Sequence, residues 1–215
     1  MRPSFIQLYA AILSFTGSLF FPAFCLVFLS GCAAPGPKYL NLSYPAAHAV
    51  KDKHQSVGLS RFNDKRPDSA KGRVGYRQLW GDKQEIFAVT GQDLSAAMTR
   101  VFRTFLEQSG FSVVLLPPWP ATAEGVSRMP QEFTHVFAAD INRFACRAVK
   151  TGVTTEMTLI IDVTFHQGTP DRDRLSTIPV VLTLERTELV FSRKKLETFI
   201  NDAIEEIFVK AFPSL

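Results

Sequence analysis

The residue types best suited to chemistry in the polar part of this chain form a short group made of Asp64, Arg66 and Gly75. The first two follow the weakly alternating segment 57–62, which predicts a strand that ends here. A carboxylate and a guanidinium at a strand end could fix an anionic or peptide ligand. The same residues also suit a structural turn, because Asp accepts backbone hydrogen bonds, Arg pairs with a carboxylate and Gly permits unusual backbone angles. We therefore expect either a ligand site or a structural turn, and the turn chemistry favours the second.

The chain has four histidines, of which His135 and His166 fall on neighbouring strands of a predicted hairpin. A turn at residues 151 and 152 would make them diagonal neighbours across the pair. A zinc site needs more ligands with supporting hydrogen bonds. Asp140 lies on the opposite strand parity and is not expected to complete such a site. We predict no metal and no cofactor.

Catalytic signatures are missing from the sequence. There is no Ser or Cys nucleophile with a local motif, no phosphate-cradling glycine loop, no zinc-protease helix and no convincing pair of carboxylates. The prediction is therefore that the protein is not an enzyme.

A more specific pattern stands near the N-terminus, where a nearly continuous apolar run from about Phe5 to Phe28 follows a single early charge at Arg2. This is the layout of a signal peptide. The run ends in a tetrapeptide that resembles a bacterial lipobox, in which the cysteine sulfur receives a diacylglyceryl group and the chain is cleaved just before it. The four residues are Leu29, Ser30, Gly31 and Cys32.

The apolar run is also long enough for a membrane-spanning helix, which needs about 20 residues. Pro22 interrupts it, and the residues after Cys32 carry no cluster of positive charge to anchor a span. We therefore predict a cleaved leader at 1–31, a lipidated N-terminus and flexible tether at 32–55, and one domain at 56–215. An uncleaved signal anchor is the alternative.

Composition narrows the classes of partner. The precursor has 215 residues, 24 basic and 20 acidic, for a net charge of +4. This excess is too small and too dispersed to predict nucleic-acid binding. The expected contacts are a membrane, through the N-terminal lipid, and an envelope protein. Of three cysteines, Cys25 lies in the leader and Cys32 is the lipidation site, so Cys146 is expected to be a buried thiol without a disulfide partner.

Two helical stripes and several alternating strands define the fold. Segments 133–146, 153–165 and 178–184 alternate as strands joined by short turns, and a change of apolar parity near Arg143 predicts a bulge. We predict an α+β domain with a mostly antiparallel sheet and two amphipathic helices packed on one face. The first stripe is Leu94, Ala97, Met98, Val101, Phe102, Phe105 and Leu106; the second is Leu196, Phe199, Ile200, Ala203, Ile204, Ile207, Phe208 and Ala211.

Local start and stop signals frame the first helix. Thr90 with Asp93 three residues later suggests a capping box, and Gly110 suits the left-handed residue after the helix. Trp80 and Trp119 could each present apolar surface to a partner or cover the edge of the core.

The lipobox is accompanied by three further features, which are the segment 41–45, the run 57–68 leading to Val74 and Gly75, and the helix ending at Gly110. Together these features make the chain resemble the YajG-like bacterial lipoproteins. The resemblance implies an α+β outer-membrane lipoprotein that faces the periplasm and has no established catalytic residue. Since Ala33 follows the cysteine where inner-membrane lipoproteins typically carry Asp, outer-membrane sorting is expected.

The leading functional hypothesis is a lipid-anchored interaction or assembly-support module. The alternatives are an auxiliary lipoprotein of a lipid-transport or secretion system and, least favoured, an envelope glycan or peptidoglycan hydrolase.

Overall fold

The structure is a computed structural model that describes residues 36–45, 55–70, 72–91, 93–213 and 215. Pro37–Leu215 forms one compact unit, which is the domain described below. The predicted leader and the motif Leu29–Cys32 lie outside the described residues. Within the described ranges, no helix has the length and apolar character needed to cross a membrane.

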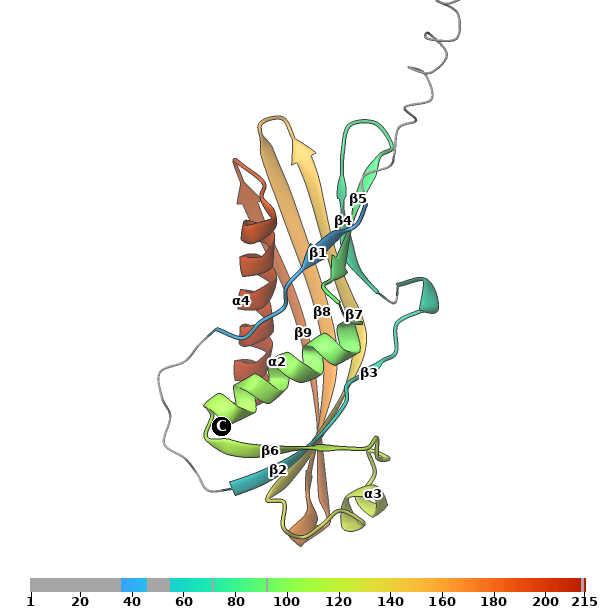
Figure 1. The fold of residues 1–215 in the computed structure, drawn as a ribbon, viewed down its shortest axis with the longest axis vertical. Helices are drawn as coiled ribbons and strands as arrows, with labels where there is room; N and C mark the ends of the chain where they lie inside the picture. Colours follow the sequence, from blue (N-terminus) through green and yellow to red (C-terminus); the bar gives the residue numbers. More distant parts are fainter. Residues whose placement is uncertain (1–35, 46–54, 71, 92, 214) are drawn as a thin grey trace, which may run out of the picture. The chain divides into compact units, whose positions relative to one another are not determined.

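The domain is built on one mixed sheet of nine strands with order β1-β5-β4-β7-β2-β6, while β3 and β8 also pair with β7, and β9 pairs with β8 (Figure 1). The strands are β1 (Lys38–Leu40), β2 (Gln55–Ser60), β3 (Asn63–Asp64), β4 (Arg73–Gln78), β5 (Gln84–Val89), β6 (Phe111–Leu116), β7 (His135–Thr151), β8 (Thr154–Thr169) and β9 (Arg174–Glu188).

The α+β class is confirmed, but a mostly antiparallel sheet is wrong. Along the described residues, β1–β5, β2–β6, β2–β7, β3–β7 and β4–β7 are parallel, and only β4–β5, β7–β8 and β8–β9 are antiparallel. The reason is the long connection between β2 and β6: it contains β3, β4, β5 and α2, and it lets the two strands pair in parallel. The short turns in the sequence predicted only the antiparallel pairs of β7, β8 and β9.

The predicted bulge is confirmed in β7. The β7–β8 register shifts between Ile141 and Arg143, so that Asn142 is the extra residue. Ile141 and Phe144 both remain in the core although they are three residues apart. The bulge therefore keeps the apolar side chains of a 17-residue strand on the core side.

Helices α2 (Leu94–Gln108) and α4 (Arg193–Ala211) bury all the side chains of the two predicted stripes. Both stripes join one core with β2, β7, β8 and β9, in which the Phe102 and Phe208 rings are 5.0 Å apart. Packing of two helices on the same apolar face is thus confirmed. The cap of α2 is Asp93, whose side chain accepts from the Ala96 N–H, rather than Thr90. The φ of Gly110 is +90°, as predicted for the residue after the helix.

A short helix, α3 (Ala123–Ser127), was not predicted. It supports a second small cluster of Trp119, Val126, Phe133 and Val136. Val136 alternates with Phe137, which belongs to the main core, so this cluster lies on the other face of β7. The remaining short elements are the 3₁₀ turns η1 (Asp68–Ala70) and η2 (Pro170–Arg172).

The domain begins earlier than predicted. Residues 37–45, assigned from the sequence to a flexible tether, include β1 and two fully buried side chains, Leu40 and Leu42. Tyr44 packs against Phe105 of α2 at 5.4 Å between ring centroids. A tether that ends at residue 55 is therefore wrong for this part of the chain, because apolar burial holds 37–45 on the core.

Candidate functional site

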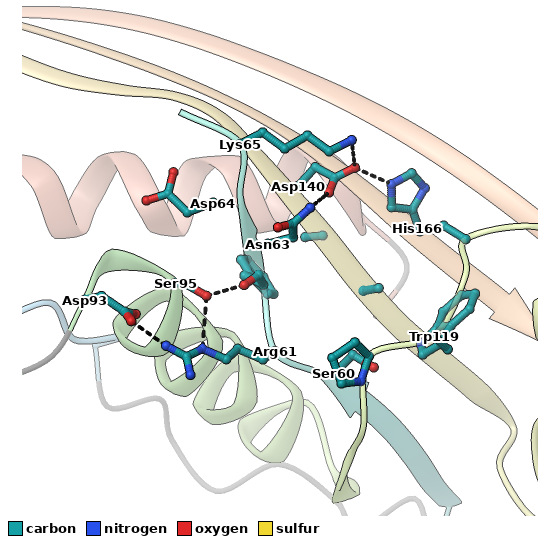
Figure 2. A pocket seen from close by; sticks show the side chains of 15 residues that line it. Ser60, Arg61, Asn63, Asp64, Lys65, Asp93, Ser95, Trp119, Asp140 and His166 are labelled. Atoms are coloured by element: carbon teal, nitrogen blue, oxygen red, sulfur yellow. Dashed lines mark hydrogen bonds and ion pairs between the residues drawn. The ribbon is translucent and has the colours of Figure 1, made fainter. Parts of the chain in front are cut away.

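The main candidate site is an open cleft of about 750 Å³, which we call the Asp140 cleft (Figure 2). It is formed where the segment from β2 to β3 passes between the N-terminus of α2, strands β7 and β8, and the loop after β6. Its lining residues are Ser60, Arg61, Phe62, Asn63, Asp64, Lys65, Asp93, Ser95, Pro118, Trp119, Ala121, Ala138, Ala139, Asp140 and His166.

Three donors converge on the carboxylate of Asp140 (Figure 2). Lys65 Nζ lies 2.7 Å from Oδ2, His166 Nε2 lies 3.1 Å from Oδ2, and Asn63 Nδ2 donates to Oδ1 at 3.0 Å. Burial alone would raise the pKa of Asp140, but hydrogen bonds from Lys65, His166 and Asn63 outweigh it, so the pKa lies below its usual value. The carboxylate is thus held ionised and ties β3, β7 and β8 together.

A second polar network lies at the start of α2. Arg61 donates from Nε to Ser95 Oγ at 3.2 Å and pairs with the capping carboxylate of Asp93. The Ser95 hydroxyl in turn donates to the backbone carbonyl of Phe62. The backbone hydrogen bond from Ala96 is the main cause that holds the pKa of Asp93 below its usual value; burial opposes it and Arg61 supports it. This network fixes the helix to the β2–β3 segment.

The wall of the cleft includes Trp119, which is 9% exposed and packs in the small cluster under α3. Its indole Nε1 is buried without a hydrogen-bond partner in the described structure. Trp80 differs, since it is 81% exposed in the turn between β4 and β5. The two tryptophans, which the sequence left open, therefore have different environments: Trp119 belongs to a core cluster and Trp80 to the surface.

The sequence-predicted pair Asp64 and Arg66 comes together, but the two side chains face each other. Arg66 donates to Asp64 from Nε at 2.9 Å and from Nη2 at 2.8 Å, and its Nη1 donates to the carbonyls of Arg73 at 2.8 Å and Phe144 at 3.1 Å. The side chains are 4% and 9% exposed for Arg66 and Asp64. This geometry is that of a buried turn clamp that joins β3, β4 and β7.

Gly75, the third member of the predicted group, lies on β4 beside Cys146 of β7. A Cβ at this position would stand 1.8 Å from the Cys146 carbonyl oxygen. Only glycine permits such a close approach of the two backbones. The residue therefore serves the strand pairing and is not part of the Asp140 cleft.

The histidines are not diagonal neighbours. His166 pairs with Ala138 in the register, whereas His135 lies at the start of β7 and contacts Gln167 and Thr169. The two rings project to opposite faces of the hairpin. Asp140 lies on the face of β7 opposite to His135, as predicted, but His166 shares the face of Asp140, because its partner Ala138 lies two residues before Asp140, and its ring reaches the Asp140 carboxylate. The bulge at Asn142 and the turn at residues 151–154 together set this register.

The hydroxyl groups of the described cleft are engaged in hydrogen bonds within the domain. The two serine hydroxyls of the cleft both donate to backbone carbonyls, Ser60 to Pro117 at 2.8 Å and Ser95 to Phe62. No group of three or more metal-ligating side chains occurs among the described residues. The Cys146 thiol is buried, and burial raises its pKa to about 12. The exposed cations Arg61 and Lys65 pair with the carboxylates of Asp93 and Asp140, so these charges of the cleft are balanced.

Comparison with known proteins gives no family assignment. No family model matches the chain, and no curated protein matches it. The structure is similar, at low sequence identity, to several solved structures. A Xanthomonas campestris protein of the DUF330 family is 10% identical, with 84% of this chain and 98% of that chain covered and a TM-score of 0.42.

A neuraminyllactose-binding hemagglutinin homologue from Helicobacter pylori is 11% identical, with coverage of 83% and 92% and a TM-score of 0.42. Lipoprotein GNA1162 from Neisseria meningitidis is 7% identical, with coverage of 72% and 98% and a TM-score of 0.36. These neighbours include a bacterial lipoprotein, and similarity at this level carries no argument about function.

Proposed function

We propose that this chain is a lipid-anchored lipoprotein of the bacterial cell envelope that acts as a non-catalytic interaction or assembly-support module. The observation that carries the proposal is the motif Leu29–Cys32 at the end of the apolar run, six residues before the first strand at Lys38. Acylation at Cys32 would attach the folded domain to a bilayer, since several acyl chains on one terminus give lasting attachment.

The Asp140 cleft supports an interaction role. Its ionisable groups are bonded to one another, its serine hydroxyls are bonded to backbone carbonyls, and its rim carries the half-exposed cations Arg61 and Lys65. Such a surface suits a polar peptide segment of another envelope protein more than it suits a reaction. The resemblance to YajG-like lipoproteins supports the finer location, the periplasmic side of the outer membrane.

Site-specific photo-crosslinking in cells tests the interaction role. A photoreactive residue replaces Lys65, in the cleft, or Lys210 on α4, whose side chains are 54% and 52% exposed. We expect a discrete adduct with one envelope protein from position 65 and none from position 210. An adduct that contains a transporter or secretion subunit would assign the protein to such a machine. Absence of any adduct from position 65, or the same adducts from both positions, would count against the proposal.

A further inference from the structure

Three connections at one end of the sheet present large apolar side chains to solvent. Trp80 between β4 and β5 is 81% exposed, Val153 between β7 and β8 is 81% exposed, and Leu189 and Val190 between β9 and α4 are 75% and 68% exposed. We call these four residues the tip patch. Large exposed apolar side chains gathered on loop tips mark an interaction surface.

The strand registers show that the three connections lie at the same end. Gln78 of β4 is opposite Val149 of β7, Val149 is opposite Glu156 of β8, and Glu156 is opposite Thr187 of β9. Each member of the tip patch follows this row by two to four residues along its own strand. Figure 1 shows the β4–β5 and β7–β8 turns and the β9–α4 connection together at the top of the domain.

The chain enters the domain near this end. Lys38 of β1 pairs with Phe87 of β5, three residues beyond Gln84, which lies in the row below the tips. Three residues of strand span about 10 Å. Strand β5 begins at the row of Gln84 and runs away from the tips, and β1 is parallel to it. The N-terminal end of β1 is therefore the end nearer the tips. Lys38 Nζ lies 3.6 Å from Glu85, one residue from that row.

The length of the chain between Cys32 and Lys38 indicates what the tip patch contacts. Five residues separate Cys32 from Lys38, so a fully extended chain from one to the other spans at most about 20 Å. The tips, about 10 Å beyond Lys38, are within that reach. The other end of β7, at His135, lies eleven residues from Cys146, which shares the row of Lys38. That is about 36 Å, so an extended connection from Cys32 reaches the tips but not the far end of the sheet.

We infer that the tip patch inserts into the interfacial region of the bilayer to which Cys32 is attached, as a second, non-covalent membrane contact. This inference rests on the proposed function. Trp is favoured at the membrane interface because its ring is apolar and its N–H is polar. Lys150 Nζ lies 5.8 Å from the Trp80 ring centroid, and Lys83 in the β4–β5 turn and Lys194 in the first turn of α4 are exposed, where they suit anionic headgroups.

The contact fixes the orientation of the domain. A short acylated connection alone leaves the domain free to rotate about its attachment. Four apolar side chains on three connections would contact the bilayer at several points and so restrict the orientation of the domain relative to the membrane. The Asp140 cleft involves β3 and the middle of β7, away from the tip row. Docking of the tips would leave the cleft open to the periplasm.

The test uses the full chain, processed in cells, purified in detergent and reconstituted into phosphatidylethanolamine–phosphatidylglycerol vesicles with brominated acyl chains. Bromine quenches only tryptophan that reaches the acyl region. Trp80→Phe removes the tip indole at an exposed site and leaves buried Trp119 as the remaining signal. We expect quenching of the unsubstituted protein and its loss in Trp80→Phe.

A matched pair of charge variants separates loss of the membrane contact from loss of the folded structure. Val153→Asp places a charge in the tip patch, while Val181→Asp places one on β9 opposite Asp162, at a side chain that is 64% exposed. We expect Val153→Asp to lose the quenching of Trp80 and Val181→Asp to keep it. Protein that floats with the vesicles but shows no quenching of Trp80 overturns the inference and leaves the anchor intact, and the tips would then be open to a protein partner. Protein that does not float overturns the proposed anchor and the inference with it.

Discussion

Replacement of Arg66 by methionine tests whether Asp64 and Arg66 form a structural clamp. The guanidinium makes two hydrogen bonds to the Asp64 carboxylate and two to the carbonyls of Arg73 and Phe144, at 2.8–3.1 Å. Arg66→Met keeps much of the apolar length of the side chain and removes all four bonds. A buried carboxylate then loses its cation, which in comparable buried pairs costs about 3–5 kcal/mol.

The expected result is a decrease of about 3–5 kcal/mol in the free energy of unfolding, measured by urea denaturation of the purified protein in one detergent. Arg128→Met is the matched control, because its pair with Glu124 is 72% and 75% exposed and should contribute less than about 1 kcal/mol. Asp64→Asn and the double variant complete a cycle that isolates the coupling of the two side chains.

A loss below about 1 kcal/mol for Arg66→Met, no greater than that of Arg128→Met, would refute the clamp. Negligible coupling between positions 64 and 66 would refute it as well. Either result would return the pair to the ligand-site interpretation, because a polar cluster kept for a ligand need not stabilise the fold.

Further predictions concern the remaining special positions. Gly75→Ala should destabilise the protein by about 1–3 kcal/mol, because its Cβ meets the Cys146 carbonyl, whereas Gly36→Ala, which meets nothing within 4 Å, should not change the unfolding midpoint. Asp93→Ala should cost about 1 kcal/mol in the same assay by removing the cap of α2, and Asp93→Asn less. Because the pKa of Asp140 is lowered on folding, its stabilisation is present above the unfolded pKa of about 3.9 and disappears as pH falls through the folded value. Asp140→Asn should therefore show a shallower loss of stability on acidification, and an unchanged pH profile would contradict this. Cys146 should resist alkylation at pH 8 until the protein is unfolded, since burial raises the thiol pKa to about 12; rapid labelling of the native protein would contradict its burial.

The helices and the meander could be predicted because their signals are local. The stripe from Leu94 to Leu106 has helical period, and the parity change near Arg143 marks the bulge. Each follows from neighbours within a few residues in sequence.

The parallel pairings and the Asp140 cleft depend on contacts between distant segments. β2 pairs with β6 across the whole of α2, and Lys65 meets Asp140 and His166 only through the β3–β7 and β7–β8 registers. A one-residue slip moves a side chain to the other face of a strand. The bulge at Asn142 makes such a slip, which is why His166 was expected on the face of His135 and the Asp140 carboxylate was missed as the centre of the site.

The domain start shows the same limitation. Residues 37–45 carry no sustained period, so they indicated a tether, yet Leu40 and Leu42 fill positions in the core beside β5 and α4. Three-residue strands have too few alternations to be recognised. Their burial shortens the chain between Cys32 and the first strand to five residues, and this short connection is what relates the anchor to the tip patch.

The most direct test of the lipoprotein assignment is the intact mass and membrane fractionation of the expressed protein beside a Cys32→Ala variant. We expect a chain that starts at Cys32, carries a diacylglyceryl group and sediments with the outer membrane, while the variant retains its leader and does not. A native protein that keeps residues 1–31, or that is recovered without lipid in the soluble fraction, would contradict the account.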